Sequence, residues 1–228
     1  MLLPMLIAGV ALAADPVLPD AWMEADAPPV AIELAERARR RCSKHWLFSG
    51  QQLPSSPDLY KRWRPERAYG TPEMISVLQS ASEEMAWIQP DAEPLMVGDI
   101  SSRRGGKLSG HRSHRGGLDA DIGLYWKGGK MVLGGSGAAA ARQIDPKANW
   151  YLIRSMLDTG QVERILLDQR IVNTLRRWTV DHGELTQEEA DRIFWRSRSD
   201  PQVWSMDGVV HHVEGHANHM HVRVKCPD

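Results

Sequence analysis

Two histidine-rich segments about a hundred residues apart most constrain how this chain can fold. Together they hold five of its nine histidines, and aspartates follow the first segment closely. The side chains concerned are His111, His114, Asp119 and Asp121 in the first segment and His216, His219 and His221 in the second. Imidazoles with one carboxylate are a common ligand set for zinc that leaves one coordination position for water. His-x-His alone is a weak signal, but the conjunction predicts a fold that brings both segments to one metal ion.

Both segments have the pattern of β-strands that present polar groups on one face. Leu118–Leu124 alternates strictly, so Asp119 and Asp121 share a face opposite the apolar side chains. Asn218–Lys225 alternates in the same way and leaves Met220, Val222 and Val224 on its apolar side. Its polar side consists of His219, His221, Arg223 and Lys225. The apolar faces can pack into a core while the imidazoles project into a cleft.

The rest of the chain mixes helical and strand patterns irregularly. Thr71 followed by Pro72 predicts a helix start, and apolar residues recur every three or four positions as far as Ile88. Further helices are expected over residues 30–41, 148–157, 171–178 and 186–195, and further strands over residues 95–100 and 162–167. This order favours an α+β fold, in which a central, mainly antiparallel sheet carries the zinc ligands and is flanked by helices.

The first residues have the composition of an export signal. Met1–Leu12 is almost wholly apolar but too short for a membrane-spanning helix of about 20 residues. Ala11–Ala13 fits the small-residue pattern of a cleavage site, although no Lys or Arg precedes the run. We expect residues 1–13 to be a signal peptide, 14–29 an extended leader and 30–228 one domain, with no membrane span after processing.

Cysteine and charge give two further expectations. Cys42 and Cys226 are an even pair in a chain that looks exported, so we expect a disulfide, with two separate thiols as the alternative. The net charge of -1 gives no reason to expect nucleic-acid binding. Five basic residues lie close to the first histidines in the sequence: Arg103, Arg104, Lys107, Arg112 and Arg115. They suit binding of an acidic substrate, and the alternative is that they belong to a solvated loop.

Several motifs, in order from Tyr69 to Pro227, resemble one family. They are Tyr69-Gly70-Thr71-Pro72, Gly98-Asp99-Ile100-Ser101, Arg104-Gly105-Gly106, Ser109 to Ile122, and His216 to Pro227. Together they look like the penicillin-insensitive murein endopeptidases, a family in the wider group of lysostaphin-type peptidases, D-alanyl-D-alanine metallopeptidases and hedgehog domains. The two histidine blocks are specific, whereas the sequence between them matches loosely.

The resemblance implies roles for individual residues. It makes His114, Asp121 and His221 the zinc ligands and His219 the catalytic partner, with His216 as a second catalytic candidate. Glu214 is a rival base, because carboxylates have that role in the related D-alanyl-D-alanine peptidases. The resemblance also places His111 around the metal. The shared strand face adds Asp119 and Arg223, and the local basic charge adds Arg112 and Arg115, as groups that support the ligands or bind substrate. Asp119 either orients a ligand imidazole or makes a structural turn contact.

The implied activity is that of an exported, periplasmic zinc endopeptidase. Its expected substrate is peptidoglycan, with cleavage of the D-alanyl to diaminopimelyl crosslink and no sensitivity to β-lactams. The alternatives are a zinc D,D-carboxypeptidase and a non-catalytic zinc domain that binds the cell wall. His45 and His182 are interpreted as structural, and His211 and His212 as exposed loop residues.

Overall fold

A computed structural model describes residues 45–135, 137–194 and 208–226. The helix predicted over residues 30–41 lies outside these ranges, as do the expected signal peptide and leader. Cys42 also lies outside them, so its pairing with Cys226 stays a prediction.

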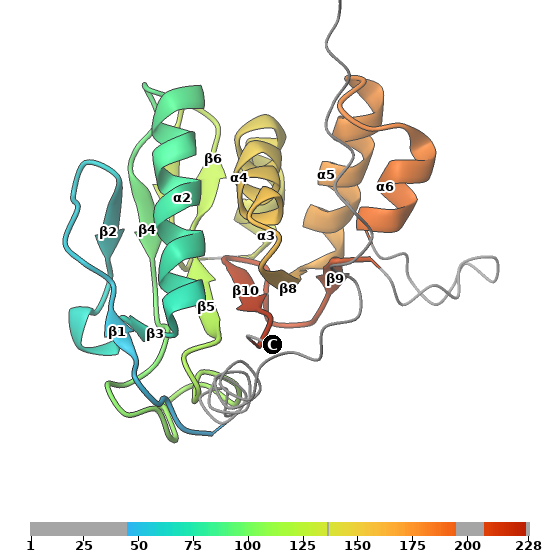
Figure 1. Cartoon of the computed structure of the whole chain (residues 1–228). Coiled ribbons are helices and arrows are strands. Elements are labelled where there is room, and N and C mark those ends of the chain that lie inside the picture. The colour runs from blue at the N-terminus through green and yellow to red at the C-terminus, as the bar shows by residue number, and fades with distance from the viewer. Residues whose placement is uncertain (1–44, 136, 195–207, 227–228) are drawn as a thin grey trace, which may run out of the picture.

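A six-stranded mixed sheet organises the molecule (Figure 1). Its strands in spatial order are β2 (Tyr60–Arg62), β4 (Leu95–Val97), β5 (Asp119–Ile122), β10 (Met220–Val224), β8 (Val162–Leu167) and β9 (Val210–His212). The three central pairings are antiparallel, whereas β2 with β4 and β8 with β9 are parallel. Two small two-stranded sheets join β1 (Gln51–Gln52) to β3 (Tyr69–Gly70) and β6 (Leu124–Trp126) to β7 (Lys130–Val132). A short 3-10 helix occupies Pro65–Arg67.

Helices α2 (Pro72–Ile88) and α4 (Pro146–Asp158) stand together on one side of this sheet, with α3 (Gly137–Gln143) beside them (Figure 1). Helices α5 (Gln169–Asp181) and α6 (Gln187–Ile193) lie beyond them, near β9. Local sequence sets the starts of these helices. The Thr71 hydroxyl accepts a hydrogen bond from the backbone N–H of Met74, and Thr186 with Glu189 forms the predicted capping box of α6.

Alternation along β5 and β10 decides which sheet face forms the core. Ala120, Ile122 and Val222 are fully buried in the cluster that also contains α2 side chains such as Leu78. Because neighbouring residues in a strand point to opposite faces, the acidic and histidine side chains project from the other face. The sheet therefore presents its polar groups on the side away from α2.

The predicted α+β class is confirmed, and the sheet is mixed, with antiparallel pairings at its centre. Asp121 and His221 lie on the sheet as expected, whereas His114 belongs to a loop. The strand expected over residues 95–100 ends at Val97, and the one expected over residues 118–124 divides into β5 and β6 at Gly123.

The interpretation of His211 and His212 as exposed loop residues is wrong. Both are half-buried on β9, which pairs in parallel with β8 through Leu166 and Leu167. This strand forms through backbone pairing with a segment about 45 residues earlier in the chain, and its own sequence has no apolar alternation.

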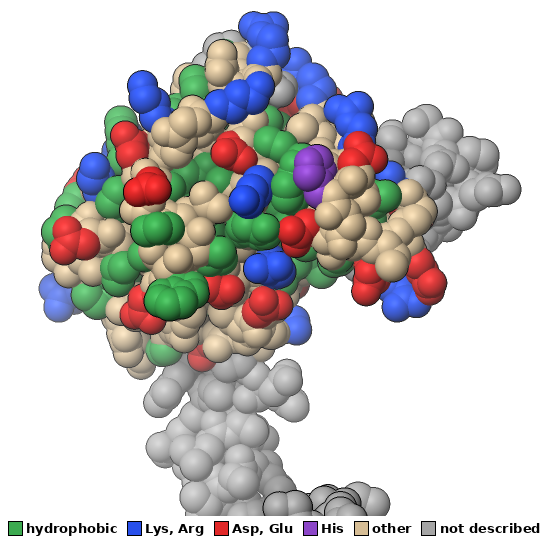
Figure 2. Space-filling model, turned by 90° about the horizontal axis from the view of Figure 1, so that it is seen from above, with side chains coloured by type: hydrophobic (Ala, Val, Ile, Leu, Met, Phe, Trp, Pro, Cys, Tyr) green, Lys and Arg blue, Asp and Glu red, His purple; other side chains and the backbone are tan. Residues whose placement is uncertain are grey.

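The surface seen from the end of the helices carries no large area of one charge sign (Figure 2). Acidic and basic side chains are interspersed there with hydrophobic ones. Within the described residues, no helix is both long enough and apolar enough to cross a membrane.

Candidate metal centre

The pairing of β5 with β10 joins the two histidine-rich segments. In the antiparallel register His221 lies opposite Asp121, and Arg223 lies opposite Asp119. Directly opposite side chains on one face of a sheet are close neighbours. The strand register therefore brings together residues that are a hundred positions apart in the sequence.

The loop between β4 and β5 supplies His111 and His114. It closes on itself where the backbone N–H of Gly106 donates to the carbonyl of Arg115 at 2.9 Å. Gly105 has φ 72°, and a Cβ there would overlap that carbonyl and the backbone of Leu47, so only glycine fits. The closed loop buries His114 to 1% exposure beside the sheet.

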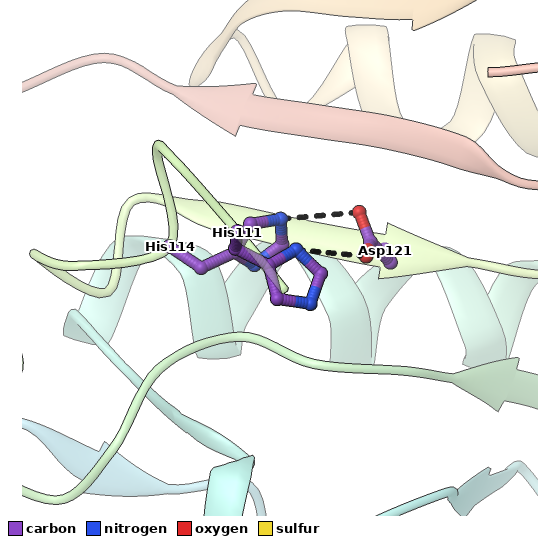
Figure 3. Close-up of side chains that lie close together, drawn as sticks. All are labelled: His111, His114 and Asp121. Atoms are coloured by element: carbon purple, nitrogen blue, oxygen red, sulfur yellow. Dashed lines mark ion pairs between the residues drawn. The ribbon is translucent and has the colours of Figure 1, made fainter. Parts of the chain in front are cut away.

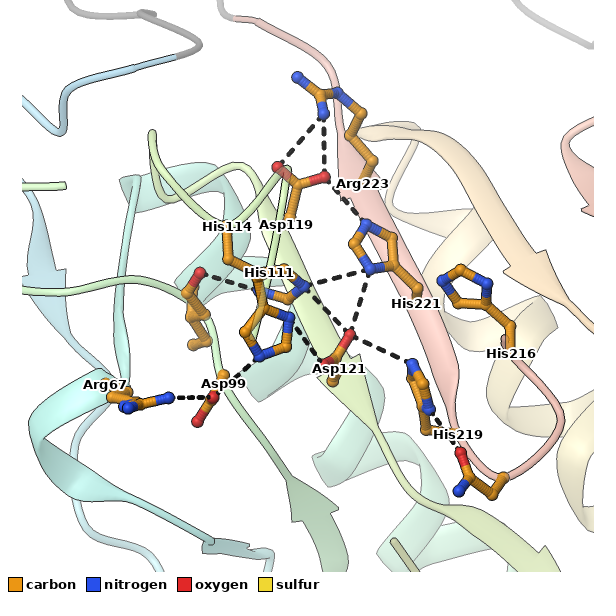
Figure 4. A network of polar contacts seen from close by, with 12 residues as sticks. Arg67, Asp99, His111, His114, Asp119, Asp121, His216, His219, His221 and Arg223 are labelled. Atoms are coloured by element: carbon orange, nitrogen blue, oxygen red, sulfur yellow. Dashed lines mark hydrogen bonds and ion pairs between the residues drawn. The ribbon is translucent and has the colours of Figure 1, made fainter. Parts of the chain in front are cut away.

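Three donor atoms form a nearly equilateral triangle at the centre of the site (Figure 4). His114 Nε2 lies 3.1 Å from Asp121 Oδ1, His221 Nδ1 lies 3.1 Å from the same oxygen, and the two nitrogens are 3.2 Å apart. Ligands about 2.0–2.1 Å from a tetrahedral zinc ion are roughly 3.3 Å from one another. The triangle therefore has nearly the dimensions of one face of a zinc coordination tetrahedron.

Hydrogen bonds on the far side of each ring fix which nitrogen faces this triangle. His114 Nδ1 donates to the carbonyl of Ile100 at 3.1 Å, and His221 Nε2 donates to Asp119 Oδ1 at 3.0 Å. In the neutral rings the other nitrogens then carry lone pairs, which point at each other and at the Asp121 carboxylate. Three electron-pair donors that converge in this way could hold a cation between them.

His111 offers a fourth donor (Figure 3). Its Nε2 donates to Asp99 Oδ2 at 3.0 Å, which leaves Nδ1 3.7 Å from Asp121 Oδ2. Donor atoms of His111, His114 and Asp121 all lie within 4.8 Å of one another, so these residues could hold a metal ion. Sequence analysis placed His111 beside the metal, and the structure brings it close enough to be a ligand.

Asp99 supports this part of the site, and sequence analysis gave it no role. Its Oδ2 atom accepts hydrogen bonds from Arg64 at 3.2 Å, Arg67 at 2.8 Å and His111 at 3.0 Å. The carboxylate is only 5% exposed. Two arginines and one imidazole thus balance a buried charge, and His111 is held with its Nδ1 toward Asp121.

The pKa values of His221 and Asp121 indicate that the centre favours a positive charge. Burial lowers the pKa of His221, but hydrogen bonds from this ring to Asp119 and Asp121 outweigh burial and raise the pKa to about 9. Burial raises the pKa of Asp121, yet the adjacent imidazoles of His114 and His221 hold this pKa well below its usual range. Without a metal, a proton occupies the position that a metal ion would take.

His219 and His216 lie beside the triangle. His219 Nε2 is 3.6 Å from Asp121 Oδ1, and its Nδ1 donates to Asn218 Oδ1 at 2.8 Å. Burial lowers the pKa of His219 to about 4, so near neutral pH its Nε2 is a proton acceptor. His216 Nδ1 donates to the carbonyl of Glu214 at 3.1 Å, and its ring centroid is 5.1 Å from that of His219.

The other predicted site residues take different positions. Arg223 Nη1 donates to Asp119 Oδ1 at 2.9 Å, so Asp119 binds both Arg223 and His221 instead of making a turn contact. Glu214 and Arg112 are exposed, and Arg112 lines a second pocket, formed by residues 107–112, which shares His111 with the site. Arg115 is half-buried. His182 is structural, because its Nδ1 donates to the carbonyl of Trp178 near the end of α5.

A pocket of about 280 Å³ opens directly beside the triangle. It is lined by Trp63, Arg64, Gly98, Asp99, Asp121, Leu133, Gly134, Asn218 and His219. The pocket is therefore bordered by Asp121, one of the three central donors, and by the neutral imidazole of His219. A buried His-His-carboxylate centre next to an open pocket could hold a metal ion and a substrate side by side.

Comparison with known proteins identifies the family. Residues 40–187 match the family model described as penicillin-insensitive murein endopeptidase, so this chain belongs to the penicillin-insensitive murein endopeptidase family. The predicted family resemblance is confirmed.

Curated relatives carry the same description. The protein of that name from Haemophilus influenzae is 29% identical over 196 residues, which cover 79% of this chain and 60% of that protein. The Yersinia enterocolitica protein is 29% identical over 197 residues, with 79% and 63% covered, and the Klebsiella pneumoniae protein is 24% identical over 196 residues, with the same shares covered. The chain thus spans about 60% of the length of these relatives.

Proposed function

We propose that this protein is an exported zinc metalloendopeptidase that hydrolyses D-alanyl to diaminopimelyl amide crosslinks in peptidoglycan. One observation supports it above all: His114 Nε2, His221 Nδ1 and Asp121 Oδ1 lie 3.1–3.2 Å apart with their lone pairs converging. The curated relatives, named murein endopeptidases, supply the substrate class.

The donor set suits zinc. Two imidazole nitrogens and one carboxylate oxygen make up a frequent catalytic zinc site, and hard cations such as Ca²⁺ prefer oxygen ligands. Asp119 and the Ile100 carbonyl hold the two ligand rings from behind, as partners of metal-bound histidines do in other zinc sites. His111 Nδ1 is available as a further donor on the side of Asp121 Oδ2.

Zinc in this position would polarise the scissile carbonyl and lower the pKa of a water molecule toward about 7. His219 then has the position of the general base, with its Nε2 3.6 Å from the ligand oxygen of Asp121. Its Nε2 accepts the proton of the attacking water and returns it to the leaving nitrogen, while Asn218 keeps Nδ1 protonated. The Asn218 amide is itself fixed, because its Nδ2 donates to the carbonyl of Gly135 at 2.8 Å. His216 is the second candidate for this proton transfer.

The remaining proposals concern processing and location. Residues 1–13 act as a signal peptide, 14–29 form a leader and 30–228 form one zinc peptidase domain in the periplasm. The Cys42–Cys226 disulfide ties the ends of this domain together. Because metal-assisted hydrolysis needs no nucleophilic serine, β-lactams do not inhibit the enzyme.

Digestion of dimeric muropeptides tests the function. The wild-type protein is expected to release monomers, to stop after chelation and to recover with added zinc. His219→Ala should keep stoichiometric zinc but lose about 10²- to 10⁴-fold in kcat, the usual contribution of a general base. His182→Ala, which alters the histidine that follows the last residue of α5 and contacts the carbonyl of Trp178, is the matched control and should retain activity.

Two results would reject this function, and a third would reassign the general base. Zinc-loaded protein that leaves dimers intact but trims terminal D-alanine from monomers would be a D,D-carboxypeptidase. Protein that binds muropeptides without cutting them would be a cell-wall binding domain. Full activity of His219→Ala would remove His219 as the general base and shift the role to His216.

A further inference from the structure

We propose that Trp63 and Arg64 form the subsite for the amine-side residue of the scissile bond, and that Arg64 selects a residue with a free carboxylate on the carbon that bears the scissile nitrogen. This inference rests on the proposed function and specifies which part of the substrate lies where. Neither residue stood out in the sequence.

The pocket beside the metal centre gives the subsite its position. Its lining includes Asp121, one of the proposed ligands, and His219. Since His219 returns a proton to the leaving nitrogen in the proposed mechanism, that nitrogen must lie within reach of its Nε2. The residue attached to this nitrogen therefore extends into the pocket that His219 lines.

Arg64 is the cation of this pocket. Nη1 donates to Asp99 Oδ2 at 3.2 Å, and the side chain is 45% exposed. Arg64 is the most distant of the three partners of Asp99 Oδ2, because Arg67 lies at 2.8 Å and His111 at 3.0 Å. A guanidinium has five N–H donors in a planar fork, and those not directed at Asp99 suit a carboxylate arriving through the pocket.

The backbone positions Trp63 and Arg64 at the end of β2. They follow β2 directly, and the backbone N–H of Trp63 donates to the carbonyl of Val97 at 2.8 Å, at the end of β4. The ion pair with Asp99 then fixes the guanidinium itself. A binding group held in this way loses little conformational freedom when the ligand binds.

The apolar part of the pocket fits an aliphatic chain. Trp63 is 56% exposed although it is a large aromatic residue, and Leu133 also lines the pocket. Gly98 keeps it open, because a Cβ there would lie 3.1 Å from Leu133 Cδ2 and from the carbonyl oxygen of Asp121. The subsite thus combines apolar surface with one carboxylate-binding group.

A matched pair of crosslinked dimers tests the proposal. They differ only in the carboxyl group next to the scissile nitrogen, which is free in one and a carboxamide in the other. Wild-type kcat/KM should favour the carboxylate by about 10- to 100-fold, the typical strength of a charge-assisted contact, mainly through KM. Arg64→Gln should bring this ratio close to one, and Arg64→Lys should restore part of it. Arg192→Gln, an exposed arginine on α6, should keep the wild-type ratio.

Calorimetric binding of the two amine products, with and without the carboxylate, separates this inference from the proposed hydrolysis. Carboxylate-dependent binding that Arg64→Gln abolishes supports the subsite even if no dimer is cleaved, a result that would reject only the peptidase. Equal cleavage or binding of both forms by the wild type overturns the subsite and leaves the peptidase standing. Loss of zinc from Arg64→Gln would also overturn it, because Arg64 would then act through Asp99 and His111.

Discussion

At the residue scale, the groups behind the imidazoles define this site as much as the imidazoles themselves. Asp119 and the carbonyl of Ile100 each accept the outer N–H of one ring, so both inner nitrogens present lone pairs to Asp121. A pair of histidines without such partners can adopt either tautomer and binds a metal ion more weakly. Asp119 is thus part of the candidate metal centre although it need not contact the ion.

Asp119→Asn tests the importance of this outer group. The asparagine keeps the shape but removes the negative charge that makes His221 Nδ1 a stronger donor. Zinc affinity should fall by about 10- to 100-fold, measured by competition with a chromogenic chelator. Glu163→Gln is the matched control, because Glu163 also pairs with Arg223 but has no contact with His221 among the described residues. Equal affinities for Asp119→Asn and wild type would show that Asp119 has no influence on the metal.

The residues that form the central triangle were easier to predict from the sequence than the residues that hold them in place. The family resemblance and the strand alternation pointed to His114, Asp121 and His221, which the structure brings together. Two roles stayed open for Asp119, because strand alternation shows on which face of the sheet a side chain lies but not which residue it contacts. Asp99 had no assigned role, since its function depends on Arg64 and Arg67, which approach from a segment over thirty positions away.

At the element scale, one loop and two strands build the centre in different ways. The strands position Asp121 and His221 through backbone register, which many side chains on the core face reinforce. The loop positions His114 through a few hydrogen bonds and through glycines with positive φ. The loop is therefore the element in which a single substitution should most easily disturb the site.

Gly105→Ala tests that dependence. The added methyl group overlaps the Arg115 carbonyl and the Leu47 backbone, and φ of 72° is also unfavourable for alanine. We expect both a loss of stability of about 2 kcal/mol or more and weaker zinc binding, measured by denaturant unfolding and chelator competition. Gly110 in the same loop has φ of 90°, and no atom lies within 4 Å of a Cβ added there. Gly110→Ala should therefore lose only the smaller amount of stability that comes from placing alanine at positive φ. Equal effects of the two substitutions would mean that the overlap at residue 105 is relieved without disturbing the loop.

Helices and long alternating strands were predictable, whereas short strands that depend on distant partners were not. The Thr71-Pro72 start and regular apolar spacing identified α2, and alternation identified β10. By contrast, β9 contains two histidines in three residues and exists through its parallel pairing with β8. Such pairing is a property of the whole sheet, which a local pattern does not contain.

At the scale of the whole molecule, the metal centre links parts of the chain that are remote in sequence. Two sheet strands and a long loop converge on three atoms, so a bound cation stabilises the arrangement of all three. Any cation that binds the folded state and not the unfolded state adds to the free energy of unfolding. In the metal-free protein, a proton on His221 takes this role.

Stability of the metal-free protein should therefore fall as the pH rises. The pKa of His221 is raised in the folded state from its ordinary value of 6.5 to about 9, so its stabilising contribution is complete below pH 6.5 and lost through pH 9. The free energy of unfolding should decrease by on the order of 3 kcal/mol across this window, measured by urea titration after chelation. His221→Gln should flatten this slope, and zinc-loaded protein should not show it, because zinc binding has already displaced the proton. If metal-free and zinc-loaded proteins lose stability in parallel between pH 6.5 and 9, His221 does not carry the proton that zinc replaces.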